Sequence, residues 1–201
     1  GGRPLPPDTL VFDLDPGPPA TIVECCRVAC LLREILRGEG LEPVPKTSGR
    51  KGMQLYVPLR GGAGDIADTS AFAKAIARHL EARHPDLITS VMAKQARPGK
   101  VFIDWSQNNP AKTTVAPYSL RANPIPTVST PLRWAEVTAC AEHGAAPPRA
   151  PSGTTPESGG AASETRPVPR PGVPPIMVFT AADVLKRVAE YGDLFGALAE
   201  G

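Results

Sequence analysis

The sequence predicts an α+β fold, in which a mixed or antiparallel sheet is flanked by helices. Apolar residues recur with period two at 9–14 and 53–58, as in strands with one buried face. At 21–37 they recur at helical spacing, and glycines at 38 and 40 end the segment. Because strands and helices do not alternate strictly, a doubly wound parallel sheet is not favoured.

Further elements follow along the chain. Strands are predicted at 41–46, 101–105 and 127–132, and a helix at 69–84 is capped by Asp68 or Thr69. Thr180 caps another helix, for which we expect Val184, Leu185 and Val188 to face inward. The 201 residues suffice for one domain with a real core. We expect that domain to comprise residues 1–143 and a helical part at 176–201.

Residues 144–175 have a different composition. They hold nine prolines, and their only larger apolar residues are Val168 and Val173. Such a segment cannot bury enough surface to offset its ordering entropy. It is therefore predicted to be a disordered, proline-rich linker that interrupts the domain.

Composition excludes few functions. The net charge of +2 does not predict nucleic-acid binding, so any electrostatic footprint must be local. Three of the four cysteines lie in one predicted helix, with no CxxC pair and no histidine nearby, which favours free thiols in a reducing, cytoplasmic compartment over a metal site. No apolar run approaches the ~20 residues that span a bilayer, so no membrane partner is expected.

The first candidate site is the strand that carries Asp13 and Asp15. Leu10, Phe12 and Leu14 point to one face, and the two carboxylates point to the other. Two converging carboxylates repel each other unless a cation binds between them, and Mg²⁺ or Mn²⁺ suits oxygen ligands. The alternative is a solvated strand end before a proline turn.

The second candidate is the turn between the strands at 41–46 and 53–58, with the sequence KTSGRKG at 46–52. Its glycines allow backbone N–H groups to face an anion, and Ser48, Arg50 and Lys51 add donors and charge. A Walker loop is excluded because a strand follows and the GxxxxGK spacing is absent. The alternative is a basic hairpin turn without a ligand.

The third candidate is Asp104, a carboxylate in the apolar strand VFIDW at 101–105. Burial of a carboxylate is costly without a partner, and a metal ion at Asp13 and Asp15 would be one. Its surroundings are basic, which suits a polyphosphate or a nucleic-acid backbone. The basic residues are Lys94, Arg97, Lys100, Lys112 and Arg121. A solvated basic face is the alternative.

Together these segments resemble the polymerase domain of bacterial ligase D, within the archaeo-eukaryotic primase superfamily. The similar motifs are VFDLDPG (11–17), KTSGRKG followed by LYVPL (46–59), and FIDWSQNN followed by KTTVAPYSLRA (102–122). PLRW (131–134) and FTAADVLKRVAEYGDLF (179–195) are similar to its C-terminal portion. The resemblance implies a primase-polymerase sheet of RRM-like type and a catalytic core at 1–143.

The resemblance also implies functions for individual residues. Asp13, Asp15 and Asp104 would be catalytic and bind two divalent cations, Mn²⁺ or Mg²⁺. The residues implied to bind the nucleotide are Ser48, Gly49, Lys51, Gly52, Gln54, Arg97, Gln107 and Arg121. The chain would be a nucleotidyltransferase that extends DNA ends in non-homologous end joining and prefers ribonucleotides. Its partners would be a Ku-type end-binding protein and an ATP-dependent ligase, near the bacterial nucleoid.

Two departures from the family pattern matter. Gln54 stands where the pattern has a histidine, so a group that can carry charge is replaced by a neutral donor. We expect this to weaken triphosphate binding by ~1–2 kcal/mol, roughly tenfold. Family domains also carry a region before the DxD strand, implied to form the 5′-phosphate pocket, which this sequence does not contain.

Two other functions remain as alternatives. The departures favour a relative that binds DNA ends or a repair partner without catalysis. A phosphatase of the haloacid dehalogenase type is also compatible with FDLDPG, but it needs a late acidic pair where the sequence offers only Asp104.

Overall fold

The computed structural model describes residues 7–59, 68–143 and 177–198. Its main sheet has five strands in the order β2–β3–β1–β5–β4, and only the β4–β5 pair is parallel. The strands are β1 (Thr9–Pro16), β2 (Val44–Thr47), β3 (Met53–Pro58), β4 (Ile88–Thr89) and β5 (Val101–Asp104). This mixed, mostly antiparallel sheet confirms the predicted fold class.

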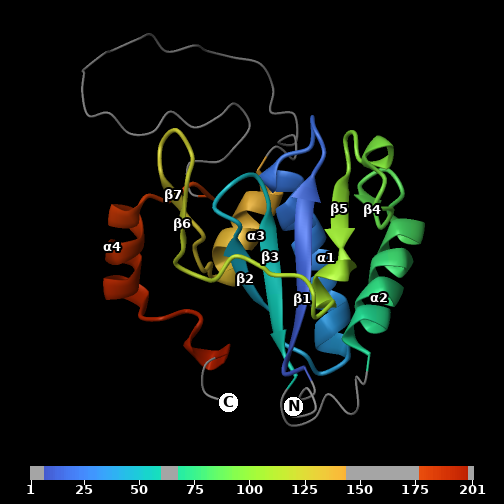
Figure 1. The fold of residues 1–201 in the computed structure, drawn as a ribbon, viewed down its shortest axis with the longest axis horizontal. Helices are drawn as coiled ribbons and strands as arrows, with labels where there is room; N and C mark the ends of the chain where they lie inside the picture. Colours follow the sequence, from blue (N-terminus) through green and yellow to red (C-terminus); the bar gives the residue numbers. More distant parts are fainter. Residues whose placement is uncertain (1–6, 60–67, 144–176, 199–201) are drawn as a thin grey trace, which may run out of the picture.

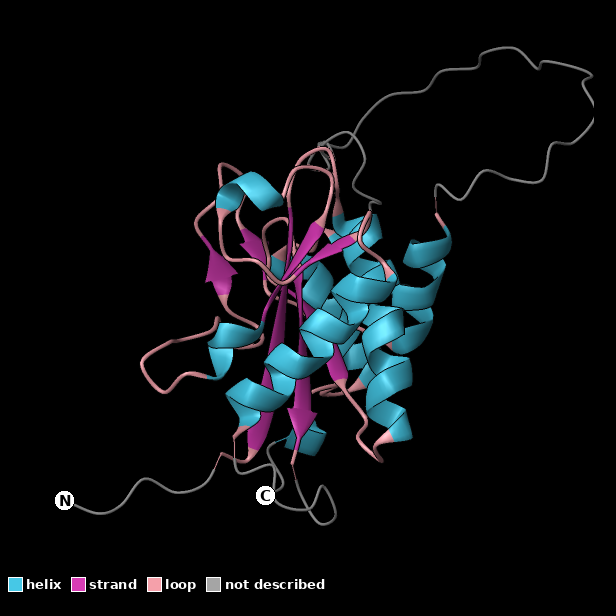
Figure 2. Ribbon diagram, turned by 90° about the vertical axis from the view of Figure 1, so that its right-hand side faces the viewer, coloured by secondary structure: helices cyan, strands magenta, loops and turns pink. Residues whose placement is uncertain are grey.

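Helices flank the sheet (Figure 1). They are α1 (Ile22–Gly38), α2 (Thr69–Arg83), α3 (Trp134–Glu142) and α4 (Ala181–Tyr191). In Figure 1, α1 and α3 lie behind the sheet and α2 lies along its β4 side, while Figure 2 shows most of the longer helices on one side of the strands. A hairpin of β6 (Leu120–Arg121) and β7 (Thr127–Val128) lies between the main sheet and α4.

The core lies between the sheet and α1. Leu10, Phe12 and Leu14 of β1 are fully buried, as the period-two pattern predicts. Leu14 pairs with Met53 on one side and Ile103 on the other, so apolar residues form a continuous row across the sheet. Helix α1 begins with a capping box between Thr21 and Glu24, which fixes its start just after the proline turn. The other face of β1 is left for polar side chains.

The C-terminal segment packs against α3 and the hairpin. Phe179 is buried, and its carbonyl oxygen accepts a hydrogen bond from the Val128 amide at 2.9 Å. Arg187 of α4 forms an ion pair with Glu136 of α3 at 2.5 Å. Of the residues predicted to face inward on α4, Val184 is buried, but Leu185 is 72% and Val188 40% exposed. That prediction was wrong because α4 contacts the domain along one narrow side that includes the polar Arg187.

Other boundaries differ from the sequence-based expectation. The strand expected at 127–132 is regular only over two residues, because Thr130 and Leu132 hydrogen-bond the edge strand β2 through isolated contacts. Helix α3 was not predicted. The predicted linker at 144–175 lies outside the described residues. None of the helices in the described ranges has the length and apolar character needed to cross a bilayer.

Candidate nucleotide and metal site

Four polar side chains form a row across the sheet on the face opposite α1. Lys46 of β2 pairs with Gln54 of β3, Gln54 pairs with Asp13 of β1, and Asp13 pairs with Asp104 of β5. Side chains of paired residues share a face, and neighbouring residues in a strand point to opposite faces, so this row lies on the other face of the sheet from the apolar row that contains Leu14. The strand register therefore brings together the carboxylates of Asp13 and Asp104, which are far apart in the sequence.

Asp13 and Asp104 converge on one amide. Nε2 of Gln107 lies 3.5 Å from Oδ2 of Asp13 and 3.4 Å from Oδ2 of Asp104. Asp104 also accepts hydrogen bonds from the Ser106 amide at 3.0 Å and from the Lys112 ammonium at 3.3 Å. The pKa of Asp13 is raised to about 6, mainly by burial and also by the charges of Asp104 and Asp15, against the lowering effect of a hydrogen bond from Gln54. The pair is an anionic centre that favours a nearby cation.

Asp15 lies on the same face of β1, but its carboxylate is already paired. Lys51 lies 2.8 Å from its Oδ1 and Arg97 lies 3.1 Å from its Oδ2. In the described ranges no three acidic, histidine or cysteine side chains are close enough together to hold a metal ion. As they stand, the residues provide a pair of ligands, Asp13 and Asp104, with Asp15 held next to it. Carboxylate oxygens are the donors that Mg²⁺ and Mn²⁺ prefer, so the pair fits such an ion.

The turn at 48–52 packs tightly against its surroundings. Oγ of Ser48 accepts hydrogen bonds from the amides of Arg50 at 3.3 Å and Gly52 at 3.2 Å. Gly49 has φ +71°, and a Cβ there would lie 2.5 Å from Cγ of Arg121. A Cβ on Gly52 would overlap the carbonyl oxygen of Leu14. Both positions therefore require glycine, one for its backbone conformation and one for the close approach to β1.

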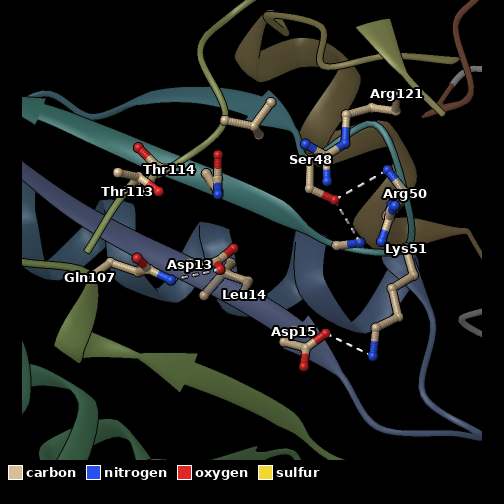
Figure 3. A pocket seen from close by; sticks show the side chains of 13 residues that line it. Asp13, Leu14, Asp15, Ser48, Arg50, Lys51, Gln107, Thr113, Thr114 and Arg121 are labelled. Atoms are coloured by element: carbon tan, nitrogen blue, oxygen red, sulfur yellow. Dashed lines mark hydrogen bonds and ion pairs between the residues drawn. The ribbon is translucent and has the colours of Figure 1, made fainter. Parts of the chain in front are cut away.

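A cavity of about 430 Å³ lies between this turn and the carboxylates. Figure 3 shows Ser48, Arg50 and Arg121 together on one side of it, across from Asp13 and Gln107. The lining residues are Asp13, Leu14, Asp15, Ser48, Arg50, Lys51, Gly52, Gln54, Gln107, Thr113, Thr114, Val115 and Arg121. Among the described residues the Arg121 guanidinium has no ion pair, and its Nε is buried without a partner. An unpaired cation in a concave site favours an anionic ligand.

The structure thus brings most of the predicted site residues together. Asp104 does not line the cavity, but its Oδ2 lies 3.4 Å from Nε2 of Gln107, which does. Gly49 does not line it either, but lies close against the side chain of Arg121, which does. Arg97 does not line the cavity, because its guanidinium stacks 3.9 Å above the Phe102 ring and pairs with Asp15. Its contact with a nucleotide remains a prediction.

Sequence reasoning missed several residues of the site. Thr113 and Thr114 line the cavity, and the Thr114 hydroxyl lies 2.7 Å from that of Tyr56. Both lie within the KTTVAPYS motif, which could have identified them. Lys46 is fully buried next to Gln54, although a lysine in a short polar strand gives no sign of burial. Burial lowers the pKa of Lys46 to about 7, against the opposing effect of the Asp13 charge.

A second cavity of about 560 Å³ lies on the other side of Gln107. It is lined by Pro7, Thr9, Val11, Asp68, Thr69, Ser70, Gln107, Asn108, Asn109 and Pro110. Asn108 fixes this wall, since its side chain donates to the carbonyl of Val11 and accepts from the amide of Val11, each at 2.8 Å. Gln107 is therefore shared by both cavities and lies next to the two carboxylates.

Known proteins are similar to this chain in sequence and in fold. Residues 2–150 match the family described as "LigD, primase-polymerase domain". The chain is 47% identical over 132 residues to the multifunctional non-homologous end joining protein LigD of Mycolicibacterium smegmatis and 36% identical over 131 residues to the bifunctional LigD of Bacillus subtilis. These matches cover 66% and 65% of this chain but only 17% and 21% of those proteins.

A solved structure agrees with the sequence comparisons. It is described as the polymerase domain from Mycobacterium tuberculosis ligase D in complex with DNA. The TM-score is 0.75 at 37% identity, and the likeness covers 99% of this chain and 57% of that one. With the three motifs, the sheet order and the shared scaffold in agreement, this chain belongs to the LigD primase-polymerase domain family.

Proposed function

We propose that this chain is the nucleotide-binding and carboxylate-bearing part of a polymerase that extends DNA ends during non-homologous end joining. The observation that carries the proposal is the convergence of Asp13 and Asp104 beside a cavity that contains the unpaired Arg121. The membership of the family supports it, since the relatives are named non-homologous end joining proteins. The chain spans about a fifth of their length, so the reaction and its partners are inferred for this chain.

The nucleotide would occupy the cavity of about 430 Å³, a volume typical of small-molecule sites. Its triphosphate would contact Ser48, Arg50, Lys51 and Arg121, because planar guanidinium groups match phosphate oxygens in pairs. The sugar and base would then lie towards Thr113 and Thr114. Ribonucleotides are the proposed substrates, with hydroxyl groups available on that side for the 2′-hydroxyl.

Asp13 and Asp104 would hold a divalent cation, Mn²⁺ or Mg²⁺, and Asp15 would complete a site for a second. Lys51 is shared between Asp15 and the cavity. A triphosphate that attracts Lys51 would therefore free Asp15 to serve as a ligand. When bound, such ions promote ionisation of the attacking 3′-hydroxyl and stabilise the leaving pyrophosphate. The residues of the chain hold the two substrates in line and neutralise the phosphate charge.

The position of Gln107 between two cavities suits a reaction with two substrates. We propose that the nucleotide occupies the basic cavity and that the 3′ end of DNA approaches from the second one. Ku-type and ligase partners follow from the same proposal, since a polymerase of DNA ends needs the ends to be held and then sealed.

One observation favours a binding role without catalysis. The carboxylate of Asp15 is held in two ion pairs, and the described side chains form no group of three metal ligands. If nucleotide does not displace Lys51, the chain would bind DNA ends or a repair partner but would not extend them.

A primer-extension assay with Mn²⁺ and ribonucleotides separates these functions. We expect the wild-type chain to add nucleotides and Asp104→Ala to abolish addition while its melting temperature is retained. Asp86→Ala is the matched control, because Asp86 is an exposed carboxylate away from the cavity. Retention of DNA binding without addition by the wild type, with any divalent ion, would leave the binding role as the better explanation.

A further inference from the structure

Lys46 is a fully buried lysine whose side-chain nitrogen has no carboxylate partner among the described residues. Instead Nζ donates to Oε1 of Gln54 at 2.6 Å and to Oγ of Ser129 at 2.7 Å. A buried ammonium whose hydrogen-bond partners are neutral is costly, which agrees with the lowered pKa of Lys46.

The contact with Lys46 determines how the Gln54 amide is oriented. When Lys46 is protonated, its ammonium group has three donors and no acceptor, so it can face the oxygen of the amide but not its NH₂ group. With Oε1 held by Lys46, Nε2 lies on the opposite side of the amide carbon, towards Asp13. A hydrogen bond from Gln54 to Asp13 agrees with this orientation.

The opposite orientation would have two costs. Oε1 would face the carboxylate of Asp13, which has no proton to donate when ionised, and the NH₂ group would face the Lys46 ammonium. The cavity floor would then present an acceptor to a triphosphate. In the observed orientation the NH₂ group has two hydrogens, of which one serves Asp13 and the other is available to a ligand in the cavity.

We propose that Lys46 is a positioning residue of the nucleotide site, which fixes Gln54 as a donor towards the cavity. The proposal rests on the proposed nucleotide-binding function and adds a residue that touches neither nucleotide nor metal. It also gives the glutamine in the place of the family's histidine a defined donor direction, because a fixed amide donates in one direction only.

Glutamine side-chain resonances test the orientation without any ligand. The sequence has three glutamines, Gln54, Gln95 and Gln107, so selective ¹⁵N labelling gives a simple spectrum in which Gln95 is an exposed reference. The Gln54 signal is assigned by its loss in Gln54→Ala. We expect its NH₂ hydrogens to exchange with water more slowly than those of Gln95. Equal exchange rates in the wild type would overturn the proposal.

The variant Lys46→Met keeps the unbranched stem and removes the donor. We expect it to shift the Gln54 signals, remove their protection from exchange, and leave Gln95 unchanged. Lys46→Leu replaces it if Lys46→Met does not fold. Ser129→Ala is the matched control, because it removes the other hydrogen bond of Lys46 and leaves the one to Gln54. If Ser129→Ala has the same effect as Lys46→Met, the role of Lys46 is only structural.

Calorimetry with a ribonucleoside triphosphate and Mn²⁺ then measures the consequence for binding. Lys46→Met should weaken binding about tenfold, or ~1.4 kcal/mol, in the wild-type background. It should have no further effect in the Gln54→Ala background, since there is no amide left to orient. Equal losses in both backgrounds would overturn the proposal. If the wild type itself does not bind nucleotide, the proposed function fails, while the exchange data still decide the orientation of Gln54.

Discussion

Asp13 and Asp15 are two residues apart on one strand, yet their environments are opposite. Asp15 has two cations on its carboxylate, Lys51 and Arg97. Asp13 has no ion pair among the described residues, and burial raises its pKa to about 6. In the absence of a metal ion the fold is therefore stabilised by one of these aspartates and destabilised by the other.

This contrast predicts opposite effects of the same substitution. Asp13→Asn should raise the free energy of unfolding of the metal-free chain by ~1–3 kcal/mol at pH 7.5, because a buried charge is removed and the shape is kept. Asp15→Asn should lower it by up to ~1 kcal/mol, because two cations lose their partner. Thermal unfolding with a chelator measures both. Stabilisation by Asp15→Asn would show that its ion pairs contribute nothing.

The buried Lys46 also changes what a histidine at position 54 would do. A histidine there would need an unprotonated nitrogen to accept from Lys46, which disfavours the charged imidazolium. Gln54→His alone should therefore change nucleotide affinity by less than about threefold, even near pH 6. This replaces the simpler expectation that a histidine tightens binding by adding charge.

Charge at position 54 should become useful once Lys46 is removed. The double variant Lys46→Leu/Gln54→His should bind a triphosphate more tightly at pH 6 than at pH 8, since imidazole then gains its proton near the ligand. Calorimetry at the two pH values, with Lys46→Leu alone as the control, measures the difference. A tightening at low pH in Gln54→His alone would contradict this account.

At the scale of elements, the side chain of Arg187 links α4 to α3 and to Pro131. Arg187 reaches both carboxylate oxygens of Glu136, at 2.5 and 2.7 Å, and also the carbonyl of Pro131 at 3.1 Å. Glu136 in turn accepts from the Arg133 amide at 2.8 Å and completes the start of α3. Bidentate pairs of this kind are among the stronger charged hydrogen bonds. They hold α4 to the domain although its apolar side chains are largely exposed.

The Glu136 contact predicts a dependence on pH. The Arg187 hydrogen bonds and the charges of Arg187 and Arg133 hold the pKa of Glu136 below its usual 4.5, against the effect of burial. Its stabilisation is therefore present above pH 4.5 and lost as the pH falls through the lower folded-state pKa. Glu136→Gln should speed hydrogen exchange in α4 at pH 7, and the difference from wild type should shrink under acid. Glu142→Gln is the control, because Glu142 is exposed.

The elements that were predicted well are those with a long periodic pattern. The strands β1 and β3 and the helix α1 each combine a clear apolar face with glycine or proline at an end. The strands β4 and β6 have two residues each, too few for a pattern, and they are defined only by their pairing with β5 and β7. Helix α3 follows Arg133, which is not a favoured cap, so its start gave no local signal.

At the scale of the whole molecule, part of the site follows from local sequence patterns and part depends on long-range contacts. The shared face of Asp13 and Asp15 follows from period two in one strand. Its partnership with Asp104 depends on strand register, and the burial of Lys46 depends on Ser129, which lies beyond the hairpin strand β7. Such long-range contacts leave no trace in local patterns. The family resemblance supplied what the local patterns could not, namely that the three motifs belong to one site.

Charge distribution over the whole molecule leads to the last prediction. The net charge is only +2, so affinity for DNA must come from a local surface rather than from overall attraction. Lys94 and Lys100 lie on the segments that join β4 to β5, and neither forms an ion pair within the described ranges. Gly17, which follows Asp15 and Pro16, donates its amide hydrogen to the carbonyl of Lys100 at 2.8 Å, which places this segment near the carboxylates.

If this segment contacts the DNA backbone, each lysine should contribute one phosphate contact. Lys94→Gln and Lys100→Gln should each lower the slope of log affinity for a duplex end against log salt by about one, for any DNA sequence. Their affinity for free nucleotide should be unchanged, because neither lines the cavity. Lys186→Gln is the control, since Lys186 is exposed on α4, and Figure 1 shows α4 beyond the β2 edge of the sheet while β4 forms the opposite edge. An equal loss in all three variants would mean that DNA responds only to total charge, and an unchanged slope in the first two would place the DNA elsewhere on the molecule.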